Sequence, residues 1–308
     1  MENNETLKSS RKKRKFKFNS DTVYYIINTA ILAFLTLIVV YPLYFLVIAS
    51  FSDPDMVMNG EVLFYPRGIT FTGFVRLFED NKIWNGYLNT IINTVASTAI
   101  SLVITITAGY GFSRPNMRFK KFFLWLFIIT MFFGGGLIPF YLVVSRLGWV
   151  NTRWALIVPS ALNVWNVFMT KAFFESNIPD GILEAARIDG ANEFTAFVRI
   201  VLPVSQAVIA VMFLFYAVGN WNSYFNALIF ITTKDELFPL QMVLREILIV
   251  ENTGALGGGS SETILEQLKL ANQLKYTSII VSTVPILCLY PFVQKYFSQG
   301  IMIGSLKG

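Results

Sequence analysis

The sequence contains no histidine and a single cysteine, Cys288, which lies inside an apolar run. The absence of histidine excludes Ser-His-Asp triads, Cys-His nucleophile pairs and metal sites built on imidazole. One cysteine cannot form a disulfide within the chain, so cysteine usage gives no indication of the redox compartment. We predict no metal site, and we interpret Cys288 as a small apolar packing residue.

Charged residues are scarce as well. They make up 14% of the chain, against about 25% in soluble domains, while 54% of the residues are hydrophobic. The central parts of the long apolar runs carry no charge, and Arg146 and Lys171 lie only at their edges. Proton relays and ion-coupled carriers usually need ionisable groups inside the membrane, and an intramembrane enzyme needs titratable groups in a cleft. The sequence therefore predicts a membrane protein that is not an enzyme, and it disfavours an ion-driven carrier.

A phosphate-binding loop is also missing. The stretch from Gly254 to Ser260 is rich in glycine but lacks the lysine that would hold a phosphate group. We therefore expect no nucleotide or other cofactor to be bound by this chain.

Six apolar runs are near or above the roughly 20 residues that a membrane-spanning helix requires. The predicted fold is accordingly an all-α membrane protein with six transmembrane helices. The runs lie at 23–51, 86–112, 119–145, 154–174, 203–231 and 276–297. Within the third run, Gly134–Gly136 and Pro139 predict an interruption, which is tolerated where protein or a wet cavity covers the freed backbone groups.

The positive charges indicate how the chain is oriented. With both termini in the cytoplasm, 16 lysines and arginines lie inside and 9 outside, which agrees with the positive-inside rule. We therefore predict a multi-pass protein of a bacterial cytoplasmic membrane. Its predicted parts are a basic cytoplasmic tail at 1–20, a transmembrane domain at 21–298 and a cytoplasmic tail at 299–308.

The polar interval at 175–203 separates two apolar runs on the cytoplasmic side. Pro179 stands where a helix would begin and Gly190 where it would end, which predicts a short independent helix. Its apolar side is expected to contain Ile182, Leu183, Ala186 and Ile188. Such a stripe outside the membrane requires a surface that buries it.

This interval resembles the EAA motif of ATP-binding-cassette (ABC) importer permeases. The matching positions are Glu184, Ala185, Ala186, Gly190, Ile200, Leu202 and Pro203. The resemblance implies a type I importer permease fold in which 179–190 is a coupling helix that docks into a groove on a cytoplasmic ATPase. The implied coupling residues are these seven and Asp189. Glu184 would engage the ATPase, the alanines would fit its groove, Gly190 would set the turn, and Pro203 would make the loop move with the fifth run as one body.

The resemblance extends over nearly the whole chain and is closest to the carbohydrate-uptake, maltose permease-like branch. Within that branch, the segments 131–139, 215–226 and 238–247 resemble permeases for complex oligosaccharides, with uronic-acid oligosaccharides as plausible cargo. The resemblance implies a second homologous permease, two ATPase subunits, a solute-binding protein and membrane lipid as partners. The outer loop at 232–275 is expected to reach into the binding protein. Nucleic acid is not expected.

A polar and aromatic cluster in the fifth run is the candidate substrate path. Buried amides need partners, and sugars offer hydroxyls together with apolar ring faces. The candidates are Asn220, Trp221, Asn222, Tyr224 and Asn226, with Asn163 and Asn166 as a smaller patch in the fourth run. An interfacial aromatic belt with hydrogen bonds between helices accounts for the same residues.

Two other functions remain open at this point. One is an importer permease for another small solute, such as a peptide or an amino acid. The other is a stand-alone channel or secondary carrier whose cytoplasmic loop happens to be helical.

Overall fold

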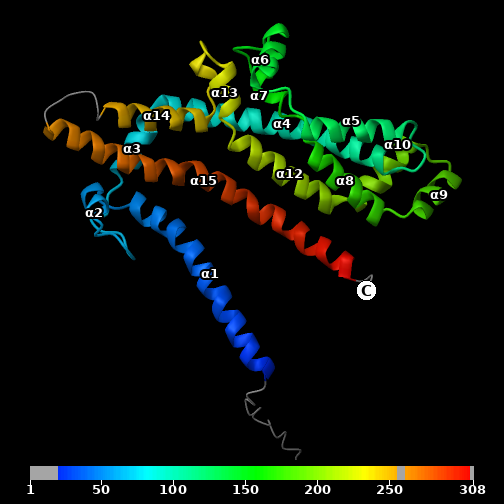
Figure 1. The fold of residues 1–308 in the computed structure, drawn as a ribbon, viewed down its shortest axis with the longest axis horizontal. Helices are drawn as coiled ribbons and strands as arrows, with labels where there is room; N and C mark the ends of the chain where they lie inside the picture. Colours follow the sequence, from blue (N-terminus) through cyan, green and yellow to red (C-terminus); the bar gives the residue numbers. More distant parts are fainter. Residues whose placement is uncertain (1–19, 255–260, 306–308) are drawn as a thin grey trace, which may run out of the picture.

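The computed structural model describes residues 20–254 and 261–305, and within those ranges every regular element is a helix (Figure 1). The predicted all-α class is confirmed. The elements are α1 (Ser20–Ser50), α2 (Pro54–Met58), α3 (Thr72–Glu79), α4 (Asn81–Ser113), α5 (Lys120–Phe132), α6 (Leu137–Arg146), α7 (Trp154–Ile157), α8 (Val164–Asn177), α9 (Asp180–Ile188), α10 (Glu193–Ala196), η1 (Phe197–Val201), α11 (Leu202–Val204), α12 (Gln206–Trp221), α13 (Phe225–Phe230), η2 (Asp235–Leu237), α14 (Leu240–Gly254) and α15 (Ser261–Ser305). Nearly all of the predicted basic tail and the end of the C-terminal tail lie outside the described residues.

Among the described residues, three helices are long and apolar enough to cross a membrane without interruption. They span Asp21–Ser50, Asn81–Ser113 and Glu266–Pro291. Two further spans exist if each bent helix pair counts as one: α5 with α6 at 115°, and Glu193–Val204 with Gln206–Trp221 at 80°. The described chain thus contains three to five candidate spans.

The third and fourth runs are both broken. The predicted interruption at Gly134–Gly136 is confirmed, and Gly136 has a φ of +84° that favours glycine. The prediction of one helix at 154–174 is wrong, because α7 ends before Pro159 and α8 begins at Val164. Proline cannot donate a backbone hydrogen bond. Asn163 then caps α8 by accepting a bond from the Asn166 amide at 3.2 Å.

The prediction of one helix at 203–231 is also wrong. Helix α12 starts after the 80° bend at Ser205 and ends at Trp221, and α13 follows after a short break. The described part of the predicted outer loop at 232–275 is mostly helical, and α14 packs there against α15 and α4. The glycine-rich 255–260 lies outside the described residues.

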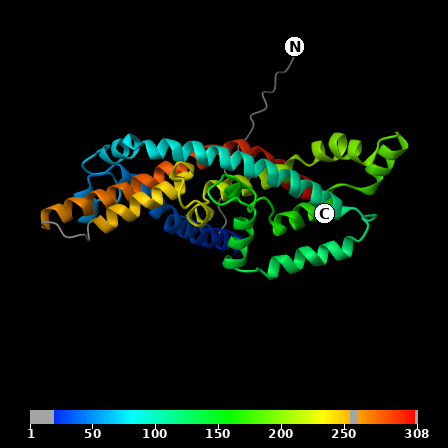
Figure 2. The same ribbon diagram turned by 90° about the horizontal axis from the view of Figure 1, so that it is seen from above.

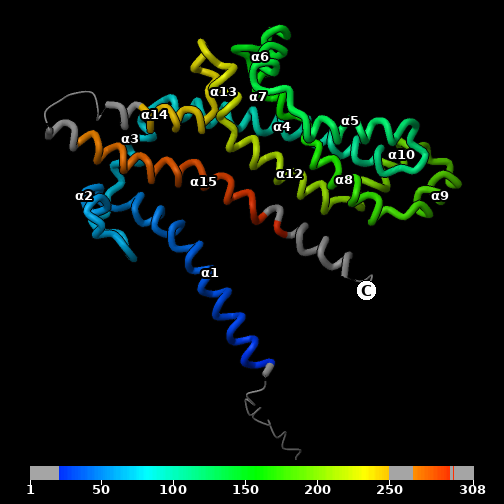
Figure 3. The backbone as a smooth tube through the Cα atoms, in the orientation of Figure 1, coloured from blue at the N-terminus to red at the C-terminus, as the bar shows by residue number. Residues whose placement is uncertain are grey.

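Figure 1 and Figure 2 show that α4, α8 and α12 run side by side along the molecule. Helix α9 lies at one end of the long axis, and α2, α3 and α14 lie towards the other. Helix α1 diverges from the bundle and packs mainly against α15 (Figure 3). Most of the apolar side chains of α1 are exposed, as expected for a helix that faces lipid or another subunit.

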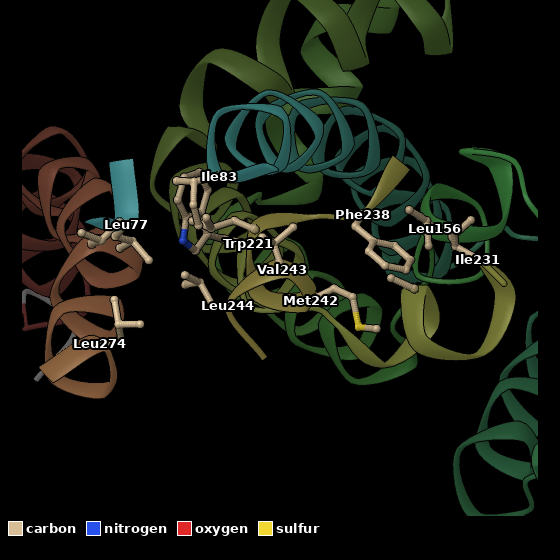
Figure 4. Close-up of a cluster of buried hydrophobic side chains, with 13 residues drawn as sticks. Leu77, Ile83, Leu156, Trp221, Ile231, Phe238, Met242, Val243, Leu244 and Leu274 are labelled. Atoms are coloured by element: carbon tan, nitrogen blue, oxygen red, sulfur yellow. The ribbon is translucent and has the colours of Figure 1, made fainter. Parts of the chain in front are cut away.

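Two apolar clusters hold the bundle at its two ends. The larger joins α3, α4, α12, α14 and α15 through residues such as Ile83, Trp221 and Leu274 (Figure 4). The smaller joins α8, α9, η1 and α12 through residues such as Phe174 and Met212. Between them, α4 presents a row of buried hydroxyl and amide side chains to its neighbours, the small polar packing that suits helices in lipid.

Candidate coupling loop and substrate path

Helix α9 forms where the sequence predicts it. Pro179 stands at its N-terminal boundary, and Gly190 ends the turn with a φ of +81°, a conformation that few other residues adopt. The Ala191 amide donates back to the carbonyl of Ala186 at 2.9 Å, which closes the turn. Asn192 then starts α10 by accepting a bond from the Thr195 amide at 2.7 Å. The short independent helix is confirmed.

The apolar side of α9 differs from the prediction. Leu183 and Ala186 are 4% and 5% exposed and pack against the chain's own core beside Phe174 and Val201. Ile188 is 87% exposed and therefore lies on another face. The methyl group of Ala186 is buried inside the permease, so of the two alanines only Ala185 is exposed to a partner.

The exposed residues of the helix and its turn are available to a partner. Glu184, Ala185, Asp189 and Gly190 are all exposed. Together with Ile188 they form what we call the outer face of α9. This face combines an apolar side chain, a small residue and two carboxylates, which suits a protein surface of mixed character.

The part of the loop that follows the turn at Gly190 leads into α12 through a bend. Ile200 and Leu202 are partly buried against the smaller cluster, whereas Pro203 is exposed in α11. Residues 197–201 form a π-helical turn, a local distortion that often marks functional positions. The loop and α12 are thus two helical segments joined at a bend, and both pack in the smaller cluster; that Pro203 makes them move as one body stays a prediction.

Ion pairs attach α9 and its surroundings to the membrane helices. Arg114, at the end of α4, lies 3.4 Å from Asp180 and stacks over the Tyr110 ring. Arg187 and Glu193 join α9 to α10 with a shortest N–O distance of 2.6 Å. The bond to Glu193 raises the pKa of Arg187 above its ordinary value. The ion pair between Arg114 and Asp180 therefore ties the start of α9 to the end of α4, a segment distant in the sequence.

A second ionic group lies near the C-terminal end of α8. Glu175 accepts bonds from Lys171 at 2.6 Å and from Lys120 at 3.4 Å, so it connects α8 with α5. Partial burial acts to raise the pKa of Glu175, but the bonds and charges of the two lysines outweigh it and hold the pKa below the ordinary value of 4.5. The carboxylate is consequently ionised throughout the neutral range.

The predicted substrate-path residues separate into two kinds. Trp221 is 6% exposed, its Nε1 donates to the Ser282 carbonyl at 2.9 Å, and it packs against Tyr87. Its side chain is therefore mostly a core element, and it also lines an apolar cavity of about 490 Å³ between α4, α12 and α15. Tyr224 and Asn222 are exposed, with Asn222 donating to the Val218 carbonyl of its own helix.

The remaining amides lie between helices. Asn220 donates to Thr98 of α4 at 3.4 Å, and Asn226 donates to Ser160 at 3.2 Å, which brings α13 to the break between α7 and α8. Asn163 is exposed, whereas Asn166 is buried in the first turn of α8. The smaller patch of the fourth run is therefore connected to the fifth run, although its two asparagines face different environments.

A polar group near the start of α4 was missed by reading the sequence. Arg153, just before α7, donates to the Oδ1 atoms of Asn89 at 2.7 Å and Asn93 at 3.5 Å. Asn93 also lines a cavity of about 20 Å³ with Asn220 and Ser223, room for about one water molecule. The two asparagines, one turn apart in an apolar run, could have indicated a buried polar position. Nothing local indicated Arg153 as their partner.

A wider cleft of about 730 Å³ lies at the opposite end of the molecule from α9. Helices α3 and α14 contribute to it together with the start of α4. Its walls carry charges of both signs, from Arg76, Asp80, Lys82, Arg245 and Glu246. A cleft of this composition suits a polar protein surface better than an apolar ligand.

Residues 80–303 match the family described as the binding-protein-dependent transport system inner membrane component. The chain belongs to this family. It is 36% identical over 272 residues to the polygalacturonan/rhamnogalacturonan transport system permease protein YtcP of Bacillus subtilis, covering 88% of this chain and 94% of that protein. It is 28% identical to the arabinooligosaccharides transport system permease protein AraQ of Halalkalibacterium halodurans, covering 90% and 94%.

A solved structure is similar along almost its full length. It is the crystal structure of a bacterial ABC transporter involved in the import of the acidic polysaccharide alginate. The TM-score is 0.79 at 30% sequence identity, covering 92% of this chain and 99% of the other. The likeness therefore includes both ends of the bundle described above.

The family settles the class of the protein. The chain is a multi-pass inner-membrane permease of a binding-protein-dependent ABC importer, as the resemblance implied, and permease subunits of this kind are not enzymes. An importer of this class includes a binding protein and an ATPase, so the permease works with both. The stand-alone channel or carrier is excluded as the main function.

Proposed function

We propose that this permease imports oligosaccharides, including chains that carry uronic acids, which a solute-binding protein delivers at the outer surface. The observation that carries the proposal is the agreement between two independent similarities. The relative at 36% identity is named for polygalacturonan and rhamnogalacturonan transport, and the similar structure is named for alginate import. Polygalacturonan and alginate are both polymers of uronic acids.

The proposed topology has six membrane crossings with both ends in the cytoplasm. Three helices, two bent pairs and the broken α7–α8 segment supply the six crossings, with the membrane domain at 21–298. The surplus of lysine and arginine on the proposed inner side supports this orientation. The tails at 1–20 and 299–308 then lie in the cytoplasm.

The outer face of α9 is the proposed ATPase contact. Glu184 provides a carboxylate, Ala185 allows close approach, and Gly190 with Asp189 forms the turn beside them. Ile200, Leu202 and Pro203 carry the displacement towards α12. ATP and Mg²⁺ stay on the ATPase subunits, and this chain holds no cofactor. A second homologous permease completes the membrane part.

The sugar passes beside the polar side chains between α4, α12 and α13. Asn220, Asn222 and Asn226 provide amides, and Tyr224 provides an exposed aromatic ring. The charged cleft of about 730 Å³ is the proposed contact for the binding protein. The hydroxyls and ring faces of a sugar match the three amides and the ring of Tyr224, whereas a strongly apolar cargo does not.

Mild-detergent purification from the native membrane tests the assembly. We expect a second permease, an ATPase and a binding protein to accompany the chain, as identified by mass spectrometry. The purified importer, reconstituted in liposomes, should then take up galacturonic-acid or arabinose oligosaccharides with ATP. Uptake of peptides or amino acids, with no oligosaccharide transported, would contradict the proposed cargo.

A further inference from the structure

Arg153 is a partly buried cation without a counter-charge among the described residues. Its guanidinium bonds only to neutral amide oxygens, those of Asn89 and Asn93. No carboxylate of the described chain lies within the 4.0 Å of an ion pair with it, although other arginines have such partners. Removing an arginine from water is unfavourable unless its charge is balanced. An anion from outside the chain would supply the counter-charge that Arg153 lacks.

The guanidinium is held in a fixed position. The Asn89 side chain donates to the carbonyls of Glu236 at 2.7 Å and Phe238 at 3.0 Å, which turns its Oδ1 towards Arg153. Asn89 is 3% exposed, so its orientation is fixed by the packing of α4 against the segment that leads into α14. Arg153 is thus positioned before any ligand arrives.

The Arg153 guanidinium has more donors than the two asparagines use. A guanidinium has five N–H donors, and the two bonds to the asparagines occupy two of them. The planar guanidinium can donate two parallel hydrogen bonds to the two oxygens of a carboxylate, which the ammonium group of lysine cannot do. Asn93, a partner of Arg153, also lines a small cavity with Asn220 and Ser223, and the amides and hydroxyl of these residues suit the hydroxyls of a sugar ring. A carboxylated sugar combines both kinds of acceptor.

We propose that Arg153 is the residue that recognises the carboxylate of a uronic-acid unit as the oligosaccharide enters the permease, and so sets the preference for acidic over neutral cargo. The inference rests on the proposed function and adds to it a named carboxylate site. In the present conformation the adjoining cavity of about 20 Å³ is too small for a sugar ring. Recognition therefore belongs to a conformation in which α4 and α12 have separated on the outer side.

Uptake of two matched probes by the complete reconstituted importer tests the site. The probes are a galacturonic-acid trisaccharide and its methyl ester, which have similar size but differ in charge. Arg153→Gln should raise the KM for the acid about 10-fold or more, the effect of losing a bond to a charged group, and leave that for the ester nearly unchanged. Arg153→Lys should retain part of the preference. Arg146→Gln, an exposed arginine at the end of α6, is the matched control and should change neither value.

A second variant keeps the arginine and supplies an internal competitor. Asn93→Asp places a carboxylate 3.5 Å from the guanidinium, where it should occupy the site and lower uptake of the acid selectively. An equal loss for acid and ester in both variants would show that Arg153 only fastens α7 to α4, and would overturn the inference. If the unaltered importer transports neither probe nor any other oligosaccharide, the proposed function itself fails.

Discussion

The two ends of the bundle are built on different principles. The loop end around α9 depends mostly on residues close together in sequence: a proline before the helix, a glycine after it, and a pair such as Arg187 and Glu193. One ion pair, between Arg114 and Asp180, ties it to a residue 66 positions away. The end around Arg153 and Asn89, which we propose to be the outer one, depends on residues 64 positions apart and on backbone carbonyls nearly 150 positions away. Local signals delimit the first, and only packing between distant segments builds the second. Variants at the loop end should therefore change coupling, and variants at the outer end should change cargo selectivity.

Replacing Gly190 should have the largest effect. Gly190→Glu places a side chain on a residue with φ of +81°, which costs about 1–2 kcal/mol and displaces the turn. We expect ATP hydrolysis to continue while oligosaccharide uptake falls at least about 10-fold, measured on one reconstituted preparation. Gly181→Glu is the matched control, since Gly181 lies within α9 and, like Gly190, has open space around it. Normal uptake by the Gly190 variant would contradict the coupling role.

The two faces of α9 can be separated by one pair of variants. Leu183→Ala removes a buried side chain and should destabilise the loop by about 3 kcal/mol. Ile188→Ala should change stability by less than about 0.5 kcal/mol but weaken attachment of the ATPase. Protease sensitivity of the loop and retention of the ATPase during purification measure the two effects. Reversed results would mean that Leu183 faces the partner.

At the outer end, Trp221 and Tyr224 should differ in a similar way. Trp221→Phe loses the bond to the Ser282 carbonyl and should lower stability by about 1 kcal/mol with little change in the KM for sugar. Tyr224→Ala should leave the melting temperature nearly unchanged and raise the KM several-fold, about 1 kcal/mol of lost stacking. Thermal unfolding and uptake kinetics together distinguish them. A large KM change with Trp221→Phe would restore that residue to the substrate path.

The smallest effect concerns the pH dependence of Glu175. Its pKa is lower in the folded protein than the ordinary 4.5, so the stability it contributes is fully present above that value and is lost as the pH falls through the folded-state pKa. The difference in melting temperature between the native chain and Glu175→Gln should thus be constant from pH 8 to pH 6 and shrink only in acid, below about pH 4.5. A difference that already shrinks between pH 7 and pH 6 would contradict this assignment.

The sequence predicted features whose causes are local. Charge depletion indicated the membrane class, Pro179 and Gly190 delimited α9, and the three glycines at 134–136 indicated a break. It failed where the outcome depends on contacts between distant segments. Neither the burial of Trp221 and Ala186 nor the meeting of Arg153 with Asn89 can be read from spacing alone, because apolar runs look alike whether they face lipid or protein. The breaks near Pro159 and Ser205 were not predicted, because the apolar runs continue across both positions.

Under the coupling role proposed for α9, the 80° bend at Ser205 determines how a displacement of the loop reaches α12. The short arm from α10 to α11 meets α12 almost at a right angle, and Ser205 at the corner is fully buried. A push along the short arm therefore has almost no component along the axis of α12 and displaces the near end of that helix sideways. The bend at Ser205 thus converts a displacement of the loop into a sideways displacement of α12. It favours rocking of α12 over a piston-like stroke through the membrane.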